Sequence, residues 1–471
     1  MNYDKLLSSK RRRKSSKKRE ITDNRSEFER DYHRIIGSAS FRRLQDKTQV
    51  FPLDKSDFIR TRLTHSLEVS SLAKSLGQTT GNMLVKQGKI SVEQGQAMSD
   101  ILLCAGLIHD IGNPPFGHFG ETVIREWFGK RLFELEFKGK PVIEYLSKQQ
   151  AEDLCHFEGN AQSLRVVTRL HHLYDDYGMN LTMALLNTII KYPVSSVECD
   201  PKSEDIRCRK LGYFSADEEI FREIVESTGA GNKRHPLTYL LEAADDIAYS
   251  TADLEDASKK GILTYSRLLQ LLENNRYKKE LEGSLEYRDM ELSIAQLKKF
   301  YKTGLEQGES DPEHFAVSNW IIAMQVILIG AACNSYIDNQ EKILKGQLKK
   351  DLFSATGSQV LAKVLKETAF EHVFQIRDIV KLEIAASTIL GSLLEDFVSA
   401  AIVYDTQELV TEKQRKLMQL ISPNYLRIYK EDSKEKSEGD RLYLRMLLVT
   451  DFIAGMTDHY AKALYQELRG L

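Results

Sequence analysis

The sequence predicts an all-α protein, and three observations support this fold class. Only nine prolines occur in 471 residues, so few positions prevent a helix from continuing. Apolar residues recur at three- and four-residue intervals instead of alternating, which is typical of amphipathic helices. Hydrophobic residues make up 42% and charged residues 28%, values that are ordinary for a soluble globular protein. The length fits two or three average domains, or one large helical domain with appendages.

Residues 1–25 are expected to form a basic N-terminal arm. Lysines and arginines cluster at 10–14 and 17–19, with too few apolar side chains to form a core element. One interpretation is a solvated arm. The other is a clamp on the phosphates of nucleotide or DNA, because clustered cations neutralise such charge. The net charge of -2 supplies no overall basic field, so any contact with nucleic acid must be local.

A helical core is expected over residues 26–261. Thr64 is a suitable N-cap for a helix that runs to Gly77, which places His65 in its first turn. A second, strongly apolar helix ends at His109 and Asp110, because the following Gly-Asn-Pro-Pro segment cannot continue it.

Residues 191–236 contain three of the nine prolines and many polar residues, so an irregular, partly exposed insertion is expected there. A further helix begins near Pro236, a favourable first-turn residue, and runs toward Gly261. From 262 to 471 the pattern predicts a C-terminal region of amphipathic helices that packs on the core. The charged stretch 430–440 is expected to be a surface loop.

Cysteine usage and the N-terminus indicate a cytoplasmic protein. None of the five cysteines forms a CxxC motif, so neither a zinc ribbon nor a disulfide framework is predicted. The N-terminus has no apolar segment of the secretory type, and no uninterrupted apolar run is long enough to cross a bilayer. We therefore expect no contact with a membrane.

Three histidine and aspartate positions are candidate metal ligands. His109 and Asp110 adjoin each other at the end of an apolar helix, where an unpaired buried carboxylate would be costly. The alternative is structural: Asp110 caps a turn and His109 forms a hydrogen bond in the core. His65, at the start of an earlier helix, would alone be read as an ordinary histidine.

Asp245, Tyr249 and Asp253 recur every four residues and therefore share one face of a helix, whereas Asp246 points elsewhere. This face could be solvated, but the surrounding alanines favour close packing around a site. Two histidines and two carboxylates form a nitrogen and oxygen set for one divalent ion. We expect Mg²⁺ or Mn²⁺, with iron, cobalt or nickel as alternatives.

The order His65, then His109 and Asp110, then Asp245 resembles the H…HD…D signature of the HD phosphohydrolase superfamily. Longer segments are similar to the bacterial deoxyguanosinetriphosphate triphosphohydrolases: 41–52, 109–121, 157–162, 191–193, 210–214, 244–249 and 451–458. The resemblance spans nearly the whole chain and is weakest between about 262 and 440. It implies an HD-domain core at 26–261.

This resemblance implies hydrolysis of a dNTP to deoxynucleoside and inorganic triphosphate, by attack of water at the α-phosphorus. It assigns His65, His109, Asp110 and Asp245 to the metal. His118 is the expected acid or base, and its three-residue spacing from Glu121 lets that carboxylate orient the imidazole on a helix. The alternative for this pair is an ordinary histidine with a capping acid.

The substrate residues follow from the resemblance alone. Gln49 and Asp253 resemble the pair that recognises the sugar 3′-hydroxyl, and Tyr249 lies where a ribose 2′-hydroxyl would collide. Cationic or hydroxyl donors are what a triphosphate requires. The set that resembles phosphate contacts is Arg62, Lys191, Tyr192 and Lys210. Each basic residue taken alone would be read as a solvated surface charge.

The family further implies a homo-oligomer, often a hexamer, and in some members a response to single-stranded DNA or to dNTP effectors. dGTP is the expected preferred substrate, with a broad-specificity dNTPase as the alternative. Two other function classes remain: an HD-type phosphodiesterase acting on nucleotides, and a non-catalytic protein that senses nucleotide or DNA through its basic arm.

Overall fold

The computed structural model describes residues 1–13, 23–49, 59–171, 175–375 and 377–471. Within these ranges the chain is predominantly helical, with one two-stranded antiparallel sheet formed by β1 (Glu136–Phe137) and β2 (Lys140–Pro141). This confirms the predicted all-α class. The predicted residues 14–19 of the basic arm lie outside the described residues.

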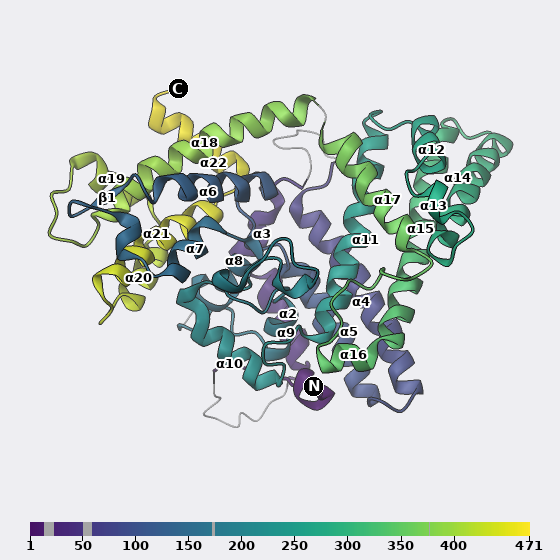
Figure 1. Cartoon of the computed structure of the whole chain (residues 1–471), viewed down its shortest axis with the longest axis horizontal. Helices are drawn as coiled ribbons and strands as arrows, with labels where there is room; N and C mark the ends of the chain where they lie inside the picture. Colours follow the sequence, from purple (N-terminus) through teal and green to yellow (C-terminus); the bar gives the residue numbers. More distant parts are fainter. Residues whose placement is uncertain (14–22, 50–58, 172–174, 376) are drawn as a thin grey trace.

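One apolar core lies among the helices that surround α11, the teal helix near the centre of Figure 1. α4 packs along α5, and α11 lies against both of them, with α15 and α17 on its other sides. The helices around this core are α2 (Glu27–Ile36), α4 (Arg62–Lys86), α5 (Val92–Ile108), α9 (Met183–Thr188), α10 (Glu218–Thr228), α11 (Pro236–Lys259), α12 (Tyr265–Glu273), α13 (Lys278–Leu281), α14 (Arg288–Gln307), α15 (Pro312–Asp338), α16 (Gln340–Lys345) and α17 (Gln359–Ala369).

A second apolar core joins α6 to the last helices of the chain, on the other side of the molecule in Figure 1. α18 packs on α6, α19 and α21. The helices of this side are α6 (Gly117–Arg131), α7 (Lys148–Cys155), α18 (Arg377–Ile402), α19 (Glu412–Leu420), α20 (Pro423–Asp432), α21 (Glu438–Ala454) and α22 (Asp458–Arg469). Because α6 begins soon after His109 and Asp110, its packing against α18 brings the C-terminal helices next to the predicted site.

Short helices complete the described chain. These are α1 (Tyr3–Leu6), α3 (Ala39–Arg43), α8 (Gly159–Arg165), the 3₁₀ turns η1 (Leu44–Asp46), η2 (Val142–Tyr145), η4 (Ser196–Glu198), η5 (Ile206–Cys208), η6 (Ser215–Asp217) and η7 (Leu285–Tyr287), and the π-helical η3 (Val166–Leu170) and η8 (Phe370–Phe374).

Helix boundaries follow the predictions at α5 and α11 and depart from them at α4. The C-cap of α5 is His109, and α11 begins at Pro236, as expected. In contrast, α4 begins after the N-cap Thr61 and continues past Gly77 to Lys86. Gly77 permits close packing instead of ending the helix, since a Cβ there would lie 3.0 Å from the Cα of Ser99 on α5.

Residues 191–236 are more ordered than the predicted irregular insertion. They include α10, which buries Phe221 and three other apolar side chains against the core. Apolar residues at helical spacing form this buried face, a signal that the surrounding prolines and polar residues obscured. The predicted loop at 430–440 is shorter than expected, because α20 continues to Asp432 and α21 begins at Glu438.

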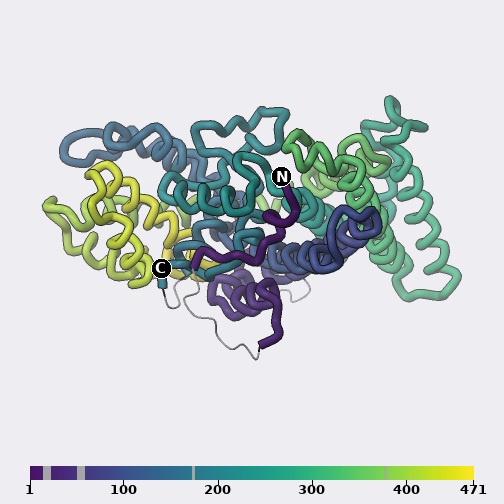
Figure 2. Tube along the Cα trace, turned by 90° about the horizontal axis from the view of Figure 1, so that it is seen from below, coloured from purple at the N-terminus to yellow at the C-terminus, as the bar shows by residue number. Residues whose placement is uncertain are grey.

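The first residues of the expected arm lie against the molecule, as Figure 2 shows near the N-terminus. Tyr3 and Leu6 are buried in the core, so the solvated-arm interpretation is wrong for this part. Arg11 pairs with Glu27 and with the buried Asp31, with 2.6 Å between charged atoms in each pair. The buried apolar residues that precede the basic cluster and the acidic partners of Arg11 together hold this segment against the rest of the protein.

In the part of the chain that the structure describes, two helices are long and apolar enough to cross a membrane by length and composition alone: α15 and residues 379–402 of α18. Their most apolar stretches are 39% and 56% buried inside the molecule. Buried core helices meet the same criteria, so this finding is weak evidence for a membrane span.

Candidate metal centre and nucleotide site

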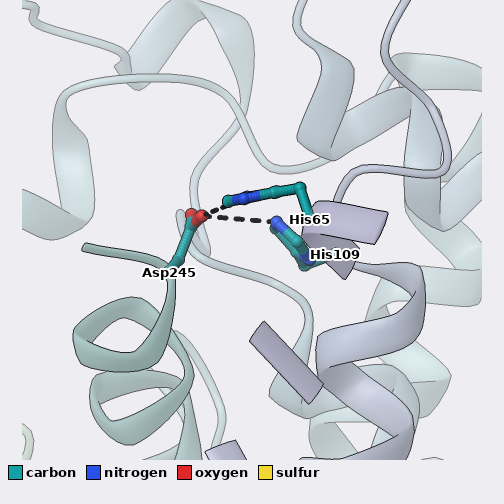
Figure 3. A group of neighbouring side chains, drawn as sticks. All are labelled: His65, His109 and Asp245. Atoms are coloured by element: carbon teal, nitrogen blue, oxygen red, sulfur yellow. Dashed lines mark hydrogen bonds and ion pairs between the residues drawn. The ribbon is translucent and has the colours of Figure 1, made fainter. Parts of the chain in front are cut away.

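Three side chains from separate helices converge on one point (Figure 3). His65 lies in the first turn of α4, His109 caps α5, and Asp245 lies on α11. Their ligand atoms lie within 4.8 Å of one another. Asp245 Oδ1 is 3.4 Å from His65 Nε2 and 3.3 Å from His109 Nε2.

The donor atoms fit a divalent cation. His109 Nδ1 lies 2.8 Å from the carbonyl oxygen of Gly106, a contact in which Nδ1–H donates and Nε2 keeps its lone pair. His109 Nε2 is buried and forms no hydrogen bond to the described residues, although Asp245 Oδ1 lies 3.3 Å away. A buried nitrogen of this kind, beside a second imidazole and a carboxylate, suits the coordination of a divalent cation.

Asp110 borders this group, with Oδ2 3.6 Å from His109 Nε2. The buried guanidinium of Arg62 forms an ion pair with the same carboxylate, and Arg62 Nε donates to the carbonyl oxygen of Thr48 at 3.1 Å. Arg62, predicted as a phosphate contact, is therefore engaged with Asp110. This pairing also explains how the carboxylate of Asp110 tolerates its surroundings.

Lys191 adds positive charge on the far oxygen of Asp245, with Nζ 2.7 Å from Oδ2. Burial alone would lower the pKa of Lys191, but the charge of Asp245 raises it above its usual value. Burial would raise the pKa of Asp245, whereas Lys191 and His109 hold it well below its usual range. Asp245 is therefore charged, which a metal ligand must be.

His118 and Glu121 form a pair in the first turn of α6, with Nδ1 3.3 Å from Oε2. The His118 side chain is 70% exposed and that of Glu121 is 2% exposed. The charge of Glu121 raises the pKa of His118 above its usual value. Burial would raise the pKa of Glu121, but His118, Lys210 and Arg125 lower it to about 2. The imidazole of His118 is therefore accessible to solvent, while the buried carboxylate of Glu121 holds its Nδ1.

Lys210, the remaining basic residue of the predicted set, pairs with Glu158, as does Arg125, which was not predicted. The Glu158 carboxylate accepts from Lys210 Nζ at 3.0 Å and from Arg125 Nη2 at 2.7 Å. Lys210 lies close enough for its charge to act on the pKa values of His118 and Tyr192. Only glycine fits at 212, because a Cβ there would lie 1.7 Å from the carbonyl oxygen of Tyr192. The two predicted phosphate-contact segments are thus pressed together.

The predicted sugar contacts have unpaired polar atoms. Asp253 is fully buried, and burial raises its pKa well above the usual value. Both Asp253 oxygens and Gln49 Oε1 are buried without hydrogen-bond partners in the described parts of the chain. The ring of Tyr249 stacks on Phe374 at 5.6 Å between centroids and 19° between planes. Unpaired buried oxygens are costly unless a ligand or water completes them.

Several residues in contact with this site were not predicted. Arg234 donates to the carbonyl oxygen of Lys191 at 2.8 Å and lies 5.9 Å from the ring of Tyr192. Glu158 lies within a segment that carried the family resemblance, so its neighbours Gly159 and Phe157 were the available signal. Phe374 had none, because its contact with Tyr249 joins residues 125 positions apart.

Comparison with known proteins gives two family matches. Residues 62–186 match the HD domain, and residues 354–467 match the phosphohydrolase-associated domain. The deoxyguanosinetriphosphate triphosphohydrolase-like protein of Listeria monocytogenes is 47% identical over 100% of both chains. A protein of the same name from Synechocystis is 34% identical over 100% of both chains.

A third relative, named deoxyguanosinetriphosphate triphosphohydrolase, comes from Serratia proteamaculans and is 32% identical over 94% of this chain and 93% of its own. The His65, His109 and Asp245 group and the full-length similarity agree with the family resemblance of the sequence. The chain belongs to the deoxyguanosinetriphosphate triphosphohydrolase family of HD phosphohydrolases.

Proposed function

We propose that this protein hydrolyses deoxynucleoside triphosphates to deoxynucleoside and inorganic triphosphate, with dGTP preferred. The observation that carries the proposal is the single face of α11 that presents Asp245, Tyr249 and Asp253. On this face the proposed metal ligand Asp245 lies near the unpaired, buried carboxylate of Asp253 and the ring of Tyr249. The last two groups are suited to binding a deoxyribose. Relatives named deoxyguanosinetriphosphate triphosphohydrolase support the base preference.

His65, His109, Asp110 and Asp245 would hold the metal. When bound, a divalent cation supplies positive charge to the phosphate oxygens and acidifies water. His118 is the acid or base, and its contact with Glu121 keeps it protonated above its usual pKa. In the proposed reaction the bond from water oxygen to the α-phosphorus forms and the bond from phosphorus to the sugar 5′-oxygen breaks. His118 gives its proton to that oxygen, the attacking water releases a proton to solvent, and His118 takes up a proton from solvent again.

The remaining residues orient the substrate. Arg62, Lys191, Tyr192 and Lys210 would contact the triphosphate, since cationic and hydroxyl donors match its charge. For Arg62 and Lys191 this requires sharing with Asp110 and Asp245. Gln49 and Asp253 would bind the 3′-hydroxyl through their unpaired oxygens. Tyr249, held by Phe374, would exclude a 2′-hydroxyl.

We further propose Mg²⁺ or Mn²⁺ as the native ion, a cytoplasmic location, and a homo-oligomer that responds to single-stranded DNA or dNTP effectors. These proposals rest on the family and on the nitrogen and oxygen donor set. The phosphate-clamp interpretation of the basic arm remains a prediction, because its second cluster lies outside the described residues.

Product analysis tests the reaction, the sugar and the base together. Each of the four dNTPs and four matching ribonucleotides is incubated with Mg²⁺ or Mn²⁺, with and without the other dNTPs or DNA. We expect inorganic triphosphate from dGTP above all. Pyrophosphate or monophosphate as the product would favour a phosphodiesterase, and no hydrolysis under any condition would favour a non-catalytic sensor.

A further inference from the structure

The C-terminal helix α22 begins with Asp458, whose side chain contacts Thr48 and Phe116, close in sequence to predicted substrate and catalytic residues. Asp458 is 2% exposed. Its Oδ2 accepts from the Thr48 backbone N–H at 2.9 Å and from the Thr48 hydroxyl, and its Oδ1 accepts from the Phe116 N–H at 2.9 Å. One carboxylate thus joins the residue before Gln49 to the residue two positions before His118.

Phe116 has a backbone conformation that needs such support. Its φ is 63° and ψ is 19°, in the left-handed region, and its side chain is buried. For a residue other than glycine this conformation costs about 1–2 kcal/mol. It persists where surrounding contacts determine it. Phe116 is the N-cap of α6 without a side-chain cap, so the direction of the first turn, which includes His118, depends on this backbone position.

Thr48 also connects Asp458 to Arg62 and Asp110, beside the proposed metal ligands. Its carbonyl oxygen accepts from Arg62 Nε at 3.1 Å, and Arg62 pairs with Asp110. A second tie runs in parallel: Lys47 Nζ donates to the carbonyl oxygens of Asn113 at 2.6 Å and Ala454 at 2.7 Å. Residues 47 and 48 are therefore held between the turn after Asp110 on one side and the end of α21 and the start of α22 on the other.

We propose that Asp458 is a positioning residue through which the C-terminal region sets the orientation of the His118 turn and of residues 48 and 49. The carboxylate does this as a double acceptor, with one oxygen for each of the two segments. This inference rests on the proposed function, because its catalytic consequence is measured as triphosphate release. Its structural consequence, the protection of the Thr48 and Phe116 amides, is measured by hydrogen exchange and does not depend on an activity assay.

The test replaces Asp458 by asparagine in the full-length protein, since Asp458→Asn keeps the shape of the side chain and removes one of its two acceptors. We expect kcat for dGTP to fall about 10²-fold, the scale of a small misplacement at a reacting centre. Titration with Mn²⁺ alone should give unchanged affinity. Hydrogen exchange should accelerate at the Thr48 or Phe116 amide, in peptides that cover 46–49 and 113–121.

Glu438→Gln is the matched control, because Glu438 is also the first residue of a C-terminal helix but pairs with Lys138 on the surface. It should leave kcat and amide exchange unchanged. Thr48→Val, which removes only the hydroxyl contact, should give a smaller fall in kcat and covers the case in which Asp458→Asn does not fold.

Wild-type kcat and amide protection in Asp458→Asn would overturn the inference. The inference would also be overturned if Asp458→Asn and Thr48→Val both lost Mn²⁺ affinity and folded protein in proportion to their loss of activity. That result would show that Asp458 has only a structural role. If the wild type releases no triphosphate, the proposed function fails, while faster exchange at 48 or 116 would still support the tie.

Discussion

Lys191 and Asp245 form a buried ion pair in which Nζ lies 2.7 Å from Oδ2, while Oδ1 of the same carboxylate faces the two histidines. If a metal ion binds Asp245 as proposed, the lysine would compete with it for the charge of the carboxylate. Lys191→Met should therefore raise the affinity for Mn²⁺ about tenfold, because a neighbouring positive charge is removed. Triphosphate release should fall, since the same lysine is proposed to contact phosphate.

Calorimetric titration with Mn²⁺ and product release measure the two effects separately. Lys366→Met is a suitable control, because Lys366 pairs at 2.7 Å with Asp246 on another face of α11. Its Mn²⁺ affinity should match the wild type. A parallel loss of affinity and activity in Lys191→Met would show that the lysine orders Asp245 instead of competing for it.

Metal removal should abolish activity and lower thermal stability. An ion that binds only the folded state stabilises it by about 2.7 kcal/mol at a hundredfold excess over Kd. We expect Mn²⁺ to raise the Tm of protein treated with chelator, and His109→Ala to remove this increase. His156→Ala, at an exposed pair with Glu152, should preserve it. An equal Mn²⁺-dependent rise in Tm in His109→Ala would place the ion elsewhere.

The pH profile should report the pair of His118 and Glu121. Glu121 raises the pKa of His118, so the protonated imidazole persists to higher pH than usual. If His118 is the acid, activity is lost as pH rises through that value. Glu121→Gln should move this alkaline limb of kcat to lower pH, whereas Glu152→Gln beside His156 should not move it. An unchanged limb in Glu121→Gln would remove His118 from this role.

The pair of His118 and Glu121 also makes the stability of the fold depend on pH. Because the folded pKa of His118 is raised, its contribution is complete below the unfolded value of about 6.5 and is lost as pH rises through the folded value. The contribution is small, since His118 is largely exposed and solvent screens the charge. The pH effect on kcat should therefore exceed the effect on Tm.

Sugar selection should depend on Tyr249 and its support by Phe374. Tyr249→Ala should raise the ratio of kcat/KM for GTP over dGTP by about tenfold or more, because the ring that excludes a 2′-hydroxyl is gone. Phe374→Ala should produce a smaller rise, since the unsupported ring can move. Phe370→Ala, on the exposed side of the same π-helical turn, is the control. An unchanged ratio in Tyr249→Ala would refute its proposed role.

Local patterns predicted the boundaries of two of the three helices that carry His65, His109 and Asp245, whereas both ends of α4 differ from the prediction. Pro236 marked the start of α11, and the Gly-Asn-Pro-Pro segment marked the end of α5 at His109. A spacing of four residues predicted that Asp245 and Tyr249 share one face of a helix. These features are readable because they depend on neighbours in the sequence and on backbone chemistry.

Contacts between residues far apart in the sequence could not be predicted from the sequence. Arg62 carries the charge expected of a phosphate contact, yet its partner Asp110 lies 48 positions away. Asp458 reaches Thr48 across 410 positions. The burial of Tyr3 depends on helices far along the chain. Side-chain type shows what a residue can bind, whereas the partner that it meets depends on the packing of the whole chain.

The buried guanidinium of Arg165 lies between Asp451 at 2.8 Å and Asp217 at 3.1 Å, and so joins the HD region to the last part of the chain. Removing one partner of a buried pair costs about 3–5 kcal/mol, a large share of the stability of an ordinary domain. A fragment that ends before α21 would retain Arg165 and lose Asp451. The two family regions should therefore unfold together in one calorimetric transition, and neither is a unit to express or engineer alone.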